Sequence, residues 1–154
     1  MKTVLVTGAN RGLGLEFCRQ YAEAGWQVIA CCRQPEKAEA LNVLAESYEV
    51  VQICPLDVVN HQQIDDLSAR LKGEVIDLLI SNAGVYGDSY GHGFGRLDYQ
   101  AWRATLETNV LSAMKLAEAF MSHLNRSQHG LFVAVSSLMG SMADNGSGGS
   151  FIYR

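Results

Sequence analysis

Short apolar runs alternate with longer amphipathic segments along the whole chain, and this alternation restricts the possible folds more than any other feature. The apolar runs predict five strands, over residues 3–7, 26–31, 49–56, 75–81 and 130–137. The segments between them have the period of helices, over residues 13–24, 35–47, 61–72 and 98–125. Strands that alternate with helices indicate parallel βαβ units.

Some of these runs are apolar at nearly every position instead of every second one, as in VLV at 4–6 and LLI at 78–80. Continuous apolar strands are typical of a parallel sheet that helices cover on both faces. The sequence therefore predicts an α/β fold with a doubly wound parallel sheet of the Rossmann type. With 154 residues, of which 48% are hydrophobic, the chain is expected to form one domain over residues 1–154.

Charge and hydropathy exclude several kinds of partner. The net charge is −4 and no cluster of Lys and Arg occurs, so neither nucleic acid nor a membrane is expected as a partner. The N-terminal apolar run is too short for a secretory signal, and no segment approaches the length of a membrane span. We expect a cytoplasmic protein that binds a small molecule.

Cysteine and histidine positions argue against a metal site. The four cysteines lack the C-x-x-C spacing of zinc and redox sites, and we expect them to be buried, reduced thiols. Cys31 and Cys32 are adjacent, so they are expected to point to opposite faces of a strand. His92 has no second ligand at metal-binding spacing, and we interpret it as a solvated residue.

The segment TGANRGLG (7–14) lies between the first predicted strand and the first predicted helix. Gly8, Gly12 and Gly14 allow a sharp turn there and let backbone amides approach a pyrophosphate at the helix N-terminus. The G-x-x-x-G-x-G spacing differs from that of phosphate-loop NTPases, so ATP hydrolysis is not supported. A plain strand-to-helix turn is the alternative, but the flanking strand and helix favour a cofactor site.

This turn resembles that of the short-chain dehydrogenase/reductase family, whose pattern T-G-x-x-x-G-x-G is matched at Thr7, Gly8, Gly12 and Gly14. The resemblance implies that the whole turn binds a nicotinamide dinucleotide, including Asn10, Arg11 and Leu13. It also implies the strand order 3-2-1-4-5.

The residues after the second strand favour NADP(H) over NAD(H). A NAD site usually has a carboxylate at this strand end, whereas VIACCRQP has none and places Arg33 there. Arg33 and Arg11 together could hold a 2′-phosphate through charge-assisted hydrogen bonds. The alternative is that either arginine is a solvated surface charge.

Two further strand ends match cofactor contacts of the family. Asp57 and Val58, after the third strand, match the pair that contacts the adenine, although Asp57 could instead cap the next helix, as Asn60 could. Asn82, Ala83 and Gly84 match the last three residues of the family's N-N-A-G, which lies beside the cofactor ribose. Ser81 replaces its first asparagine.

Three residues match the family's catalytic groups. Ser137, rather than the adjacent Ser136, matches the serine that binds the carbonyl oxygen, and Tyr153 matches the tyrosine that donates the proton. Asn109 matches the asparagine that, from within a long helix, holds a water or a helix kink in the proton relay. Taken singly, each could be a strand-end serine, an aromatic core residue or a surface amide.

The printed sequence ends at Arg154, one residue into the family's Tyr-x-x-x-Lys motif. The last strands of a family member are also missing. We therefore expect residues 1–154 to be the N-terminal part of a longer enzyme, and we expect little or no activity from them alone. The long Ser137-to-Tyr153 separation, with the loop 143–150 between, is similar to the carbonyl-reductase and C-factor-like branch.

The leading hypothesis is an NADP(H)-dependent oxidoreductase that transfers hydride between the nicotinamide and a carbonyl or alcohol substrate. A non-catalytic dinucleotide sensor or signalling protein is the alternative. The epimerase branch is less consistent with the glycine spacing. The helix at 98–125 could form a homo-oligomer interface, as family members often do.

Overall fold

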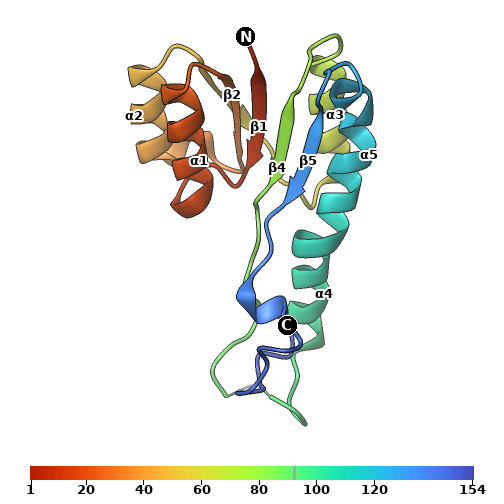
Figure 1. Cartoon of the computed structure of the whole chain (residues 1–154). Helices are drawn as coiled ribbons and strands as arrows, with labels where there is room; N and C mark the ends of the chain where they lie inside the picture. Colours follow the sequence, from red (N-terminus) through yellow and green to blue (C-terminus); the bar gives the residue numbers. More distant parts are fainter. Residues whose placement is uncertain (92) are drawn as a thin grey trace.

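The computed structural model describes residues 1–91 and 93–154; His92, interpreted above as solvated, lies outside the described residues. A five-stranded parallel sheet forms the centre of the molecule (Figure 1). Its strands are β1 (Thr3–Thr7), β2 (Gln27–Cys32), β3 (Val51–Pro55), β4 (Leu78–Ser81) and β5 (Leu131–Ala134). The spatial order is β3-β2-β1-β4-β5, so the predicted fold class and strand order are confirmed.

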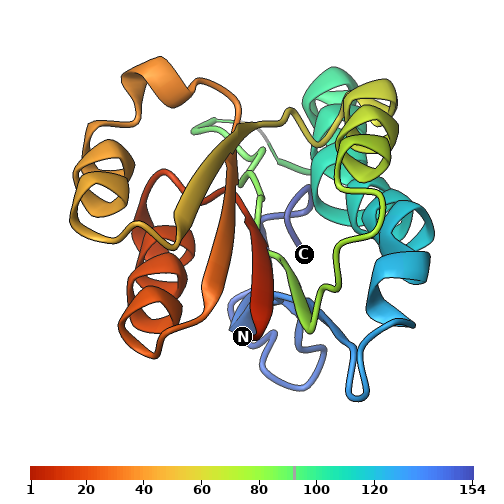
Figure 2. The ribbon, with the colours of Figure 1, turned by 90° about the horizontal axis from the view of Figure 1, so that it is seen from above.

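Helices cover the sheet on two sides, as Figure 2 shows from above. One side carries α1 (Gly12–Glu23) and α2 (Glu39–Ser47), and the other carries α3 (His61–Arg70) and α5 (Ser112–Leu124). Short 3-10 turns η1 (Pro35–Lys37) and η3 (Leu138–Gly140) follow β2 and β5. No helix among the described residues is both long enough and apolar enough to cross a membrane.

Alternate residues of each strand supply the two apolar layers. Val4 and Val6 pack in the layer under α1 and α2, whereas Leu5 packs in the layer under α3 and α5. Cys32 and Cys31 divide in the same way, which confirms that they point to opposite faces. All four cysteines are buried free thiols, as predicted. Burial raises the pKa of each of the four thiols.

The helix predicted over 98–125 is not uniform. It consists of α4 (Tyr99–Leu106), a π-helical turn η2 (Glu107–Leu111) and α5. Asp98 caps α4 by accepting hydrogen bonds from the backbone amides of residues 100 and 101. The π turn contains Asn109, one of the predicted site residues, and π turns inside α-helices often occur at functional sites.

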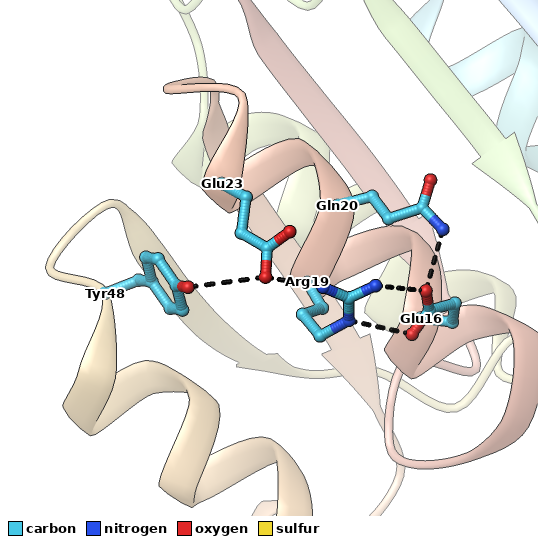
Figure 3. Close-up of polar contacts among 5 residues, drawn as sticks. All are labelled: Glu16, Arg19, Gln20, Glu23 and Tyr48. Carbon is cyan, nitrogen blue, oxygen red and sulfur yellow. Dashed lines mark hydrogen bonds and ion pairs between the residues drawn. The ribbon is translucent and has the colours of Figure 1, made fainter.

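A polar network lies on the outer surface of α1 (Figure 3). The Arg19 guanidinium bonds both oxygens of Glu16 and one oxygen of Glu23, and Gln20 also donates to Glu16. These hydrogen bonds, that of Arg19 first, lower the pKa of Glu16 to about 2. Tyr48, which follows α2, reaches Glu23 over a longer 3.5 Å contact. Because these groups are exposed, the network adds little stability.

The edge strand β5 is less covered than the edge strand β3, two of whose residues are buried. β5 pairs only with β4 among the described strands, and its side chains are half-buried or exposed. Beyond the carboxyl ends of β4 and β5, two long connections extend away from the sheet and approach each other near the C-terminus (Figure 1). One of them contains the predicted loop 143–150, which is exposed over residues 143–149.

Candidate active site

The carboxyl ends of the central strands open into two cavities. The first has a volume of about 650 Å³ and the second of about 590 Å³. Both are lined by Asn82, Ala83, Gly84 and Val85, which follow β4. The two cavities therefore lie next to each other at the carboxyl ends of the strands. Doubly wound folds bind their ligands at this end of the sheet.

The glycine turn shapes the first cavity. Gly8 and Gly12 have φ angles of +66° and +55°, in the left-handed region. A Cβ on Gly14 would lie 2.2 Å from the Gly8 carbonyl oxygen, so α1 could not approach the turn with a larger residue there. A Cβ on Gly12 would meet nothing within 4 Å, and Gly12 lines the cavity. This position is therefore open to a ligand.

Thr7 fixes the end of β4 against the end of β1. Its buried hydroxyl oxygen accepts hydrogen bonds from the amides of Asn82, at 3.0 Å, and Ala83, at 3.1 Å. The Asn82 side chain donates in return to the carbonyl oxygens of Thr7 and Gly8. Thr7 itself does not line either cavity, so its contribution is to hold the residues that do.

Most predicted cofactor residues meet in the first cavity. Its lining includes the predicted residues Gly8, Asn10, Arg11, Gly12, Arg33, Asp57, Val58, Asn82, Ala83 and Gly84. Arg11 and Arg33 are exposed, and neither pairs with a carboxylate in the part of the chain that the structure describes. Leu13 lines the second cavity instead.

The structure shows which of two candidate residues caps α3. Asn60, not Asp57, caps α3, because the Asn60 side chain accepts a hydrogen bond from the Gln63 amide. Asp57 accepts one from the Val59 amide and lines the first cavity. At the N-terminus of α1, the N-cap residue Arg11 makes no side-chain capping hydrogen bond within the described part of the chain, so the first amides of the helix can bond a ligand or water.

The three predicted catalytic residues all line the second cavity. Ser137 Oγ accepts a hydrogen bond from the Met139 amide at 3.2 Å, which orients the oxygen and leaves its O–H able to donate. Tyr153 packs against Tyr86, with ring centroids 5.0 Å apart. Among the described residues, those that line this cavity carry no charged side chain.

Asn109 connects the π turn to the connection that follows β4. Its Oδ1 accepts a hydrogen bond from the Val85 amide and its Nδ2 donates to the Val85 carbonyl oxygen, both at 2.8 Å. This pair of bonds engages both the oxygen and the nitrogen of the amide group, and it leaves one N–H and one lone pair for other partners. The side chain is therefore oriented by the backbone, in the lining of the second cavity.

Two residues of this region were not predicted from the sequence. Asp88 accepts hydrogen bonds from the amides of residues 152 and 153. Arg154 donates to the Met139 carbonyl oxygen at 3.1 Å and so connects the Tyr153 segment to the turn after Ser137. Neither residue has a local sequence signal, because the partners lie 64 and 15 residues away along the chain.

The described residues include no group of three or more His, Cys, Asp or Glu side chains that could hold a metal ion.

The chain belongs to the short chain dehydrogenase family, which it matches over residues 2–149. An uncharacterized oxidoreductase of Mycobacterium tuberculosis is 33% identical over 142 residues, which cover 89% of this chain and 55% of that protein. The chain thus spans little more than half the length of this curated relative.

Solved structures agree with this assignment. A short-chain dehydrogenase/reductase of Burkholderia multivorans with bound NADP is 34% identical, with a TM-score of 0.91. The alignment covers 99% of this chain and 66% of that one. A carbonyl reductase of Pseudomonas aeruginosa PAO1 in complex with NADP is 31% identical, with a TM-score of 0.90, over 99% of this chain and 69% of that one.

Proposed function

We propose that this protein is an NADP(H)-dependent oxidoreductase that interconverts a carbonyl compound and the corresponding alcohol. The observation that carries the proposal is the pair of neighbouring cavities: the glycine turn and two arginines line one, and Asn109, Ser137 and Tyr153 line the other. The similar structures with NADP, one of them a carbonyl reductase, support it.

The first cavity fits the adenosine and phosphate part of the cofactor. Gly12 leaves space for a pyrophosphate, and the uncapped amides of α1 can donate hydrogen bonds to it. Arg11 and Arg33 would hold the 2′-phosphate, because their charges are not neutralised by neighbouring carboxylates among the described residues. We assign Asp57 and Val58 to the adenine.

The cofactor ribose would lie where the two cavities meet. The residues that line both cavities there include Asn82, Ala83 and Gly84. Their backbone is fixed by Thr7 and, through Val85, by Asn109. Such a prearranged wall lowers the cost of ordering the site when the cofactor binds.

Bound NADPH supplies a hydride. The protein then has to polarise the carbonyl group and provide a proton for the oxygen. Ser137 would donate its O–H to the carbonyl oxygen, because the bond that its oxygen accepts from the Met139 amide orients the hydroxyl and does not use this donor. Tyr153 would give the proton, and Asn109 would hold the Val85 backbone as the floor of the site. A neutral cavity suits an uncharged carbonyl group.

The remaining assignments concern the whole protein. We take residues 1–154 as a dinucleotide-binding domain, or the N-terminal part of one. Exposed apolar side chains along α4 to α5, including Val110 and Met114, support a homo-oligomer interface there. Free thiols are typical of proteins in a reducing compartment, and we therefore assign this protein to the cytoplasm.

The test combines cofactor binding with turnover. Tyr153→Phe and Ser137→Ala should each lower NADPH-dependent reduction of an aldehyde and ketone panel by about 10²-fold or more, within the range that general acids and hydrogen-bond donors contribute. NADPH affinity, measured by the fluorescence of the bound nicotinamide, should stay within about two-fold because neither residue lines the first cavity.

Two matched variants complete the test. Tyr90→Phe removes the hydroxyl of a fully exposed tyrosine and should leave turnover unchanged. Ser136→Ala distinguishes the two adjacent serines, and a loss as large as that of Ser137→Ala would reassign the hydroxyl. Binding of NADPH without any turnover in the intact protein would favour the sensor alternative, and absence of binding would reject the proposal.

A further inference from the structure

Three consecutive residues of the connection after β4 contact the segment that carries Tyr153. They are Tyr86, Gly87 and Asp88, and we refer to them as the clasp. The contacts join positions about 65 residues apart in the chain. Each member contacts this segment in a different way.

Asp88 makes the polar contact. One carboxylate oxygen accepts a hydrogen bond from the Ile152 amide at 3.2 Å and the other accepts one from the Tyr153 amide at 2.8 Å. Hydrogen bonds from backbone amides to a carboxylate are charge-assisted and stronger than those between neutral groups. Because both oxygens are used, the direction of the backbone at Tyr153 is fixed by one side chain.

Tyr86 makes the second contact. Its hydroxyl lies 2.7 Å from Ser150 Oγ, and its ring packs on the Tyr153 ring. Ser150 has a φ of +48°, the only positive φ at a non-glycine residue within the described chain. A left-handed conformation costs such a residue about 1–2 kcal/mol, so neighbouring contacts have to hold it.

Gly87 lets the clasp fit. Its φ is +78°, and a Cβ there would lie 2.1 Å from Thr105 Oγ1 on α4 and 2.7 Å from Ile152 Cγ2. Ile152 is buried, with 5% of its surface exposed. The backbone of residue 87 therefore passes between α4 and the Tyr153 segment with no room for a side chain.

We propose that Asp88 is a positioning residue, which sets the place of the Tyr153 phenol in the second cavity. Asn109 holds Val85 directly before the clasp, so the two site residues are joined through four consecutive residues of the chain. The effect on turnover rests on the proposed function, whereas the effect on the place of Tyr153 does not.

The experiment compares Asp88→Ala and Asp88→Asn with Asp144→Ala in the intact protein. Asp144 lies in the exposed loop and is the matched carboxylate, because no hydrogen bond to its side chain is found among the described residues. Hydrogen exchange of the amides of residues 152 and 153, and NMR of tyrosine rings, report on the segment without requiring activity. NADPH affinity and steady-state kinetics are measured in parallel.

In Asp88→Ala, exchange of the two amides should rise about ten-fold or more, since each loses a charged acceptor. The Tyr86 and Tyr153 ring signals should shift, while those of Tyr21 and Tyr48, on other elements, stay in place. Turnover should fall by up to about 10²-fold with little change in substrate KM or NADPH affinity, as expected when a reacting group is displaced by about 1 Å.

Asp88→Asn keeps one acceptor and should recover part of both effects. Wild-type exchange and ring signals in Asp88→Ala would overturn the proposal, and so would equal changes in Asp144→Ala. A loss of signals throughout Asp88→Ala would mean global unfolding; Asp88→Asn then decides, and unchanged segment signals in that folded variant would also overturn it. If the wild-type protein binds no NADPH, the proposed function is wrong. The hydrogen-exchange results still show whether Asp88 positions the Tyr153 segment.

Discussion

Cofactor selectivity gives the sharpest test of the site, and Arg33 is the residue to change. The Arg33 side chain is exposed, lines the first cavity and has no carboxylate partner among the described residues. Arg33→Ala therefore removes no internal ion pair, and the free energy of unfolding should change by no more than about 0.5 kcal/mol. Any larger effect on NADPH binding would be due to lost contacts with the ligand.

A hydrogen bond to a charged group is worth about 1.5–3 kcal/mol when shielded from water. Exposure of Arg33 reduces this to about 1–2 kcal/mol, since solvent and salt screen surface charges. Because 1.4 kcal/mol is a factor of ten, the NADPH Kd should rise about five- to thirty-fold. The NADH Kd should stay within two-fold, because NADH lacks the 2′-phosphate.

The assay is fluorescence titration of both cofactors at about 20 mM and 200 mM salt. The NADPH effect should be smaller at the higher salt, where exposed charges are more strongly screened. Arg11→Ala should act in the same direction, and the double variant should deviate from additivity if both guanidinium groups hold the same phosphate. Arg126→Ala changes the charge equally, but Arg126 lines neither site cavity; it lies with Met1 in the lining of a separate cavity of about 700 Å³, so the change should alter neither affinity.

Equal weakening of NADH and NADPH in Arg33→Ala would refute the assignment, since it would mean that the arginine does not recognise the phosphate that distinguishes them. An effect of the same size in Arg126→Ala would also refute it, by assigning the change to net charge alone.

Three further predictions concern the residues that support the site. Gly14→Ala should lower the free energy of unfolding by about 1–3 kcal/mol in urea titrations, because its Cβ would lie 2.2 Å from a backbone oxygen; an unchanged urea midpoint would contradict this. Thr7→Val should cost about 1–3 kcal/mol by the same assay, because two partly buried amides lose their acceptor. Burial acts to raise the pKa of Asp77, but hydrogen bonds from Ser127 and the Thr3 amide, with nearby positive charges, outweigh it and hold the pKa below its usual value of about 3.9. Since its folded pKa is the lower one, Asp77 stabilises the fold above about pH 4 and loses this contribution as pH falls through the folded pKa. Asp77→Asn should therefore destabilise the protein at pH 7 and progressively less below pH 4, and a difference from wild type that stays constant between pH 3 and pH 7 would contradict this.

The sheet could be predicted from the sequence because its signals are local. Apolar runs, helical periods and a glycine turn each occupy one short segment, and the resemblance to a family supplied the strand order. The cavity linings also followed from local signals, since parallel strands bring their carboxyl ends to one edge. The roles assigned to the site residues stay predictions until the variants above are measured.

The parts that could not be predicted depend on contacts between distant segments. The π turn accompanies the pairing of Asn109 with Val85, 24 residues away. Asp88 lies in a glycine-rich connection where an acidic residue has an ordinary explanation as a solvated loop residue, and its amide partners are about 65 residues away. No periodicity or motif within one segment contains this information.

The π turn also changes the angular phase of the long helix. Each residue of an α-helix advances by about 100°, and a π turn advances less per residue, so side chains before and after it differ in direction from those of an uninterrupted helix. α5 can thus bury Leu116 and Phe120 against the sheet while α4 places Thr105 beside Gly87. The part of the long helix after residues 107–111 therefore packs in the core, and the part before them packs near the Tyr153 segment. A substitution on one side of the π turn can change one of these regions without changing the other.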